Sequence, residues 1–145
     1  MAAALGLLAL WALATAMLLA HALIGIPGGY LGAGYPLHPG LTVSHLSLLR
    51  DSALATSPIP VATLVMLWPS WRYRLARFML LSLVALLWLW AADQLIWLFV
   101  IDLGTTWARF EPLLELTLHP VLTPLALAPV LALAWRVSAS QPGAT

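Results

Sequence analysis

Three ionisable side chains interrupt otherwise apolar stretches of the sequence: His21, Asp93 and His119. Two histidines on different helices can bind a haem b iron, and a ligating histidine usually donates its second ring nitrogen to a carboxylate or carbonyl. A quinone could exchange protons with the same groups. Two histidines and one acid are also a ligand set that a metal ion accepts, but their spacing matches no metal motif and we assign no metal ligands.

A structural interpretation of these three residues competes with the cofactor one. Polar side chains on neighbouring membrane helices often hydrogen bond to each other, which contributes about 0.6–2 kcal/mol per contact. The sequence therefore leaves these two readings for His21, Asp93 and His119, beside a third in which they line a path for protons, ions or a substrate. In the first two readings they form either a haem or quinone site or a set of contacts that hold helices together, and the second reading is the simplest one.

Asp93 lies in the most apolar part of the chain, the stretch from Phe78 to Ile101, where it is the single ionisable residue. A helix of this length covers roughly 36 Å at about 1.5 Å per residue, which exceeds the ~30 Å hydrocarbon core of a bilayer. The stretch is apolar on all sides, whereas a soluble helix has one apolar face. We therefore expect a transmembrane helix here.

Composition supports a membrane protein for the whole chain. Hydrophobic residues make up 63% of the 145 residues and charged residues only 8%, against about 25% charged residues in soluble domains. The net charge of +1 argues against nucleic-acid binding, which needs a basic patch. Cysteine is absent, so disulfides and thiolate chemistry are excluded.

Hydrophobic runs predict four spans in a single transmembrane domain, residues 1–145. The fold class is an all-α integral membrane bundle with proline-kinked second and fourth helices and an outer loop rich in Gly and Pro over residues 25–52. Pro58 and Pro60 break the second span, so its helix could begin earlier, near Thr42, and kink. The predicted spans are residues 4–24, 53–68, 78–101 and 113–135.

The first span has two further features. Ala12, Ala16 and Ala20 recur every four residues, a small-residue row that would let another helix approach closely. Ala20-His21-Ala22 has the small-x-small pattern of a signal-peptide cleavage site. A signal peptide begins with a positively charged region, however, and the segment before Ala20 contains no Lys or Arg. We expect the segment to be retained as a span.

Depths along the predicted spans place the three ionisable groups in one leaflet. Counted from the span centres, Asp93 lies roughly 6 Å, His119 roughly 8 Å and His21 roughly 10 Å toward the outer side. A carboxylate facing lipid costs from ~3 to over 10 kcal/mol, so we expect Asp93 to face protein and to be either protonated or paired. By depth a histidine is the best partner, and Arg50 is next if the second helix starts early. Arg50, Asp51 and Gln94 are the other candidate structural polar residues, and Asp93 shares its helix face with Leu86, Leu89, Trp90 and Trp97.

Arginines predict the orientation. Four spans place both termini and Arg72, Arg74, Arg77 and Arg136 on one side, and arginine excess marks the cytoplasm. We therefore expect cytoplasmic termini, in a bacterial inner (plasma) membrane.

The expected function is that of a small polytopic membrane protein, a non-enzymatic subunit or accessory factor of a larger membrane complex. No hydrolase, zinc-protease or nucleotide-binding motif is present. The expected partners are the lipid bilayer and either another membrane protein or further copies of this chain. One alternative is an electron-transfer subunit that binds haem b or quinone. A second is a small oligomeric transporter that uses the broken helices.

Overall fold

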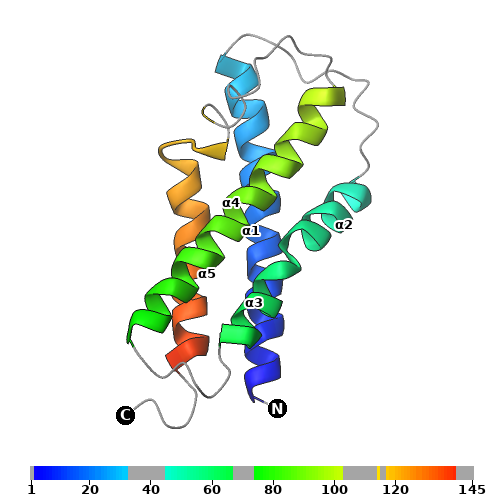
Figure 1. Cartoon of the computed structure of the whole chain (residues 1–145). Helices are drawn as coiled ribbons and strands as arrows, with labels where there is room; N and C mark the ends of the chain where they lie inside the picture. Colours follow the sequence, from blue (N-terminus) through cyan, green and yellow to red (C-terminus); the bar gives the residue numbers. More distant parts are fainter. Residues whose placement is uncertain (1, 33–44, 67–73, 103–113, 115–116, 140–145) are drawn as a thin grey trace.

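The computed structural model describes residues 2–32, 45–66, 74–102, 114 and 117–139, and every regular element among them is helical (Figure 1). The predicted all-α class is thus confirmed for this part of the chain. Of the predicted outer loop, residues 25–52, the parts 25–32 and 45–52 are helical instead, and residues 33–44 lie outside the described residues, as does the turn that contains Arg72. The elements are α1 (Ala2–Gly32), α2 (His45–Thr56), α3 (Pro58–Met66), α4 (Arg74–Asp102) and α5 (Leu122–Ala139).

Three of these helices are long and apolar enough to cross a membrane. The qualifying stretches are Ala3–Ala22 in α1, Ala76–Trp97 in α4 and Leu122–Ala139 in α5. They overlap the first, third and fourth predicted spans, so the chain has the character of a membrane protein. A bundle of four complete spans stays a prediction.

The second predicted span is divided at Ser57 into α2 and α3. The residue before a proline avoids helical geometry, and Pro58 has no amide hydrogen to continue the helix. The Ser57 amide donates instead to the Leu54 carbonyl at 3.2 Å, and the Ser57 hydroxyl donates to the same oxygen at 2.8 Å. α2 starts at His45. The structure therefore agrees with the alternative in which the second helix begins near Thr42 and kinks, and not with a helix that begins at residue 53.

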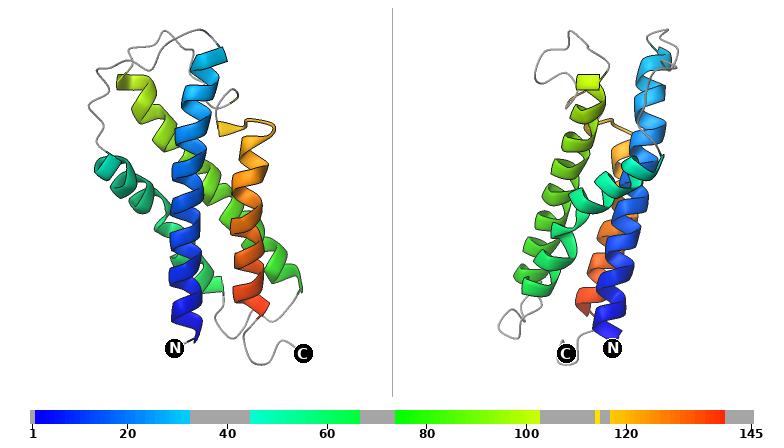
Figure 2. Two further views of the ribbon diagram at one scale, coloured as in Figure 1. Left: turned by 180° about the vertical axis from the view of Figure 1, so that it is seen from behind. Right: turned by 90° about the vertical axis from the view of Figure 1, so that its right-hand side faces the viewer.

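The helices alternate in direction around α1 (Figures 1 and 2). α1 and α4 run away from the end where α1 begins, whereas α2–α3 and α5 run back toward it. α1 packs against each of the other four helices, and α4 also packs against α2, α3 and α5. The start of α1 and the end of α5 therefore lie at the same end of the bundle, next to the first residues of α4.

Two helix boundaries differ from the predicted ones. α1 continues to Gly32 rather than ending near residue 24, because backbone groups in an apolar environment need hydrogen bonds within the helix, and the glycines do not prevent them. α5 begins at Leu122 rather than near residue 113. Before α5, the described residues Leu114 and Thr117 have π-helical backbone geometry.

The core forms between one buried face of α1 and one large residue on α4. Leu10, Ala14 and Leu18 of α1 are fully buried, and Trp88 of α4 is the largest fully buried side chain in the described part of the chain. The predicted small-residue row faces elsewhere: Ala12 and Ala16 are exposed and Ala20 is half-buried. The contact face of α1 is thus offset by two residues from the predicted one, because Ala14 leaves room for the Trp88 ring.

Candidate functional site

His21 forms a buried hydrogen-bonded cluster between α1 and the start of α5. Its side chain is only 3% exposed, and its Nε2 lies 3.1 Å from the Thr123 hydroxyl. That hydroxyl donates its single hydrogen to the Thr117 carbonyl at 2.7 Å. Thr123 therefore only accepts from His21, so the proton of the neutral imidazole is on Nε2. The other nitrogen, Nδ1, is buried with no hydrogen-bond partner among the described residues.

His119 explains why the Thr117 carbonyl is available. Its Nδ1 accepts hydrogen bonds from the amides of Val121 at 3.2 Å and Leu122 at 3.1 Å. His119 thus caps the N-terminus of α5, where the first amides of a helix have no internal partner. Pro120 follows it at the start of the helix, a position in which proline loses no hydrogen bond. The Thr117 carbonyl, left without the Val121 amide, accepts from the Thr123 side chain.

Trp88 covers the other side of His21. Its ring meets the imidazole edge-on, with centroids 5.4 Å apart and an interplanar angle of 85°. The Trp88 Nε1 donates to the Ala14 carbonyl at 3.3 Å. One tryptophan thus ties α4 to α1 and seals the histidine from outside. Sequence reasoning noted tryptophans in this helix but did not connect Trp88 with His21.

Asp93 lies apart from this cluster. It is five residues after Trp88, so the two side chains point about 140° apart around the helix. Asp93 is half-buried, while Leu86 and Trp90 on the same face are 65% and 52% exposed. Within the described residues it has no hydrogen bond or ion pair. This differs from the expectation that Asp93 faces protein and meets a histidine, because the Trp88 face of α4 packs inward instead.

The described geometry does not suit axial haem ligation by both histidines. A metal ligand needs a nitrogen lone pair, yet His119 Nδ1 accepts from two amides, which places the proton of its neutral ring on Nε2. His21 Nε2 is also protonated, so only His21 Nδ1 keeps a lone pair. The arrangement favours the structural reading of the histidines.

A second polar contact, not anticipated from the sequence, joins α1 to α2. The Thr15 and Thr56 hydroxyls are 2.8 Å apart, and the Trp11 Nε1 donates to the Ala53 carbonyl at 3.0 Å. The signal for it was a hydroxyl side chain at a central position of an apolar span. This contact holds the kinked element against α1 and fixes its height along that helix.

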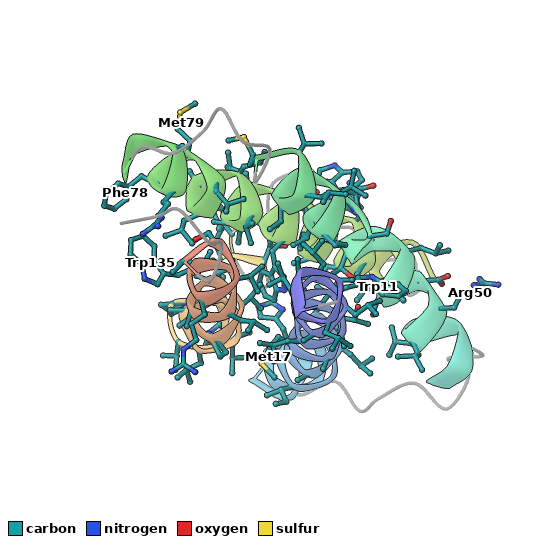
Figure 3. The ribbon with its side chains drawn as sticks, turned by 90° about the horizontal axis from the view of Figure 1, so that it is seen from below. Trp11, Met17, Arg50, Phe78, Met79 and Trp135 are labelled. Atoms are coloured by element: carbon teal, nitrogen blue, oxygen red, sulfur yellow. The ribbon has the colours of Figure 1, made fainter. Side chains whose placement is uncertain are left out.

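The remaining candidate polar residues lie at the surface. Arg50 Nε donates to Asp51 Oδ1 at 2.9 Å, and the two side chains are 69% and 28% exposed. Figure 3 shows Arg50 on the outer side of α2, directed away from the bundle. Gln94 is exposed next to Asp93. None of these three contacts the histidine cluster in the described structure.

Comparison of the chain with protein-family models, with curated proteins and with solved structures gives no match.

Replacing Thr123 with valine is expected to lower the free energy of unfolding by about 1–2 kcal/mol, because it leaves the His21 Nε2–H and the Thr117 carbonyl buried and unpaired. The measurement is a titration of the protein from mild detergent into SDS, in which circular dichroism monitors the unfolding. Thr123→Ser keeps the hydroxyl and serves as the control. A loss in Thr123→Ser with none in Thr123→Val, which keeps the methyl group, would show that methyl packing and not the hydrogen bonds stabilises this site.

Proposed function

We propose that this chain is a non-enzymatic subunit of a larger membrane assembly, and that it binds its partner through the outward face of α4. The observation that carries the proposal is Asp93, an acid within a candidate span that has no described partner. A carboxylate facing lipid costs at least ~3 kcal/mol. A partner that donates a hydrogen bond or a positive charge removes this cost.

The surroundings of Asp93 also support an interface. Trp90 and Leu86 expose large apolar surfaces on the same face, and Gln94 adds an exposed amide beside them. Tryptophan is enriched at the centres of interfaces, where its large ring contributes much of the binding energy. The outward face of α4 thus combines an aromatic anchor with polar groups that need partners.

The proposed orientation places both termini in the cytoplasm of a bacterial cell, with the protein in the inner membrane. Its support is that Arg77 lies in the first turn of α4 and Arg136 in the last turn of α5, and both of these helix ends are at the end of the bundle where α1 starts. The Arg77 guanidinium lies 5.6 Å from the centre of the Trp135 ring, an arrangement typical of the membrane–water boundary. In this proposal α2 and α3 together form a kinked fourth membrane element.

The test is the size of the assembly in native membranes. Extraction in mild detergent and native electrophoresis should show the wild-type chain in a species well above its own 15.6 kDa plus bound detergent. Asp93→Asn should shift most of the chain to the smallest species, because the amide cannot form a charge-assisted bond. Ser82→Ala is the matched control, since Ser82 is an exposed polar residue that comes before Asp93 in the same helix. An unchanged assembly in Asp93→Asn would refute the proposal.

A further inference from the structure

Residue counts along α2 and α4, which are both inclined to α1 (Figure 1), place Arg50 and Asp93 at similar heights on these adjacent helices. The heights follow from two consecutive residues of α1: the Ala14 carbonyl binds Trp88 of α4, and the Thr15 hydroxyl contacts Thr56 of α2. Asp93 is five residues beyond Trp88, about 7.5 Å along α4, and Arg50 is six residues before Thr56, about 9 Å along α2. Since α2 runs opposite to α4, both displacements are toward the same end.

The Arg50 guanidinium keeps donors for another carboxylate. Asp51 engages only its Nε, and the side chain is 69% exposed. A guanidinium has five N–H donors, and the two terminal nitrogens bind a carboxylate in a bidentate manner. Neither terminal nitrogen has a partner in the part of the chain described here. The chain therefore carries an acid without a cation and, at a similar depth, a cation with free donors.

A second copy of the chain would bring these two groups together. Two copies inserted in the same orientation are related by an axis along the membrane normal, so residues of one copy meet residues of equal depth in the other. In a two-fold dimer each contact also occurs twice. We infer that the assembly proposed above contains a dimer of this chain, in which Arg50 of each copy pairs with Asp93 of the other. This inference rests on the proposed function and names the partner.

The surfaces around both residues suit such a contact. Leu49 and Leu54 of α2 are 46% and 64% exposed, and Leu86 and Trp90 of α4 are 65% and 52% exposed. α2 packs beside α4, so the two sets of side chains belong to neighbouring helices. Packed against a second copy, they would surround the two ion pairs with apolar side chains and lower the local dielectric constant, which strengthens the attraction.

The first experiment measures dimerisation in lipid vesicles by energy transfer between donor- and acceptor-labelled copies, diluted progressively with lipid. Asp93→Asn and Arg50→Gln should each raise the dimer dissociation constant at least about tenfold, because one charge of each pair is left unpaired. The exchanged variant, Arg50→Asp with Asp93→Arg, should return to within about threefold of wild type, since the pairing is restored. Ser82→Ala is the control for substitution on α4. Circular dichroism of each variant verifies its fold.

A second experiment does not depend on the charge variants folding. Because the chain contains no cysteine, Leu49→Cys copies and copies with Gln94→Cys, which is exposed beside Asp93, can be mixed and treated with a short bifunctional thiol reagent. Cross-links between the two variants are expected, whereas Leu125→Cys, exposed on α5, should give none with either. A monomeric wild type, or an exchanged variant that folds but stays dissociated, would overturn the inference. If Asp93→Asn still releases the chain from native assemblies in that case, the partner is a different protein and the proposed function stands.

Discussion

Replacing Trp88 with alanine is expected to lower the free energy of unfolding by about 3–5 kcal/mol, the range found for large-to-small changes in cores. The ring is fully buried between α4 and α1, against Ala14 and His21. Its loss opens a cavity and removes the hydrogen bond to the Ala14 carbonyl. It also uncovers the edge of His21, which is itself buried.

The measurement is an SDS titration followed by near-ultraviolet circular dichroism, performed in detergent that keeps the chain monomeric. Trp90→Ala is the matched control, because Trp90 is two residues away and 52% exposed. Surface substitutions usually change stability by less than about 0.5 kcal/mol. Similar losses for the two variants would contradict the assignment of Trp88 to the core and Trp90 to the outer surface.

Replacing Ala14 with leucine should have the second-largest effect, a loss of about 1–3 kcal/mol from overpacking. Ala14 has no exposed surface, and its backbone carbonyl accepts the hydrogen bond from the Trp88 indole. Additional side-chain carbons would push α4 away from α1 and lengthen that hydrogen bond. Helix propensity contributes little to this loss, because leucine is only slightly poorer than alanine as a helix former.

Ala16→Leu provides the comparison for this variant. Ala16 lies two residues away on the exposed side of the same helix, so the added leucine meets lipid or detergent. The same SDS titration should show little change in its unfolding midpoint. A large loss for Ala16→Leu and none for Ala14→Leu would instead favour the contact face formed by Ala12, Ala16 and Ala20.

The positions of the helices were predictable from the sequence to a large extent, because the membrane imposes length and composition. The predicted span at residues 78–101 lies within α4, Arg74–Asp102. The break at Pro58 was also anticipated, since a missing amide hydrogen acts locally. The cap at His119 had a local signal too, a polar side chain directly before a proline.

The inward face of each helix was not predictable in the same way. A helix that is apolar all round has no polar side to turn toward water, so hydrophobicity does not select the buried face. In α4 the selection depends on shape: the large Trp88 ring fits over Ala14, and Asp93 is thereby turned outward. The expected meeting of Asp93 with His21 and His119 assumed depth alone, and depth does not specify rotation about the helix axis.

α1 has 31 residues, and its regular helix of roughly 46 Å is far longer than the ~30 Å hydrocarbon thickness. Its apolar stretch, Ala3–Ala22, covers roughly 30 Å and so matches that thickness without any mismatch. The last part of the helix, as far as Gly32, therefore extends beyond the hydrocarbon into the headgroup layer and the water outside it. The chain thus presents regular helix, and not only connecting segments, beyond one surface of the bilayer.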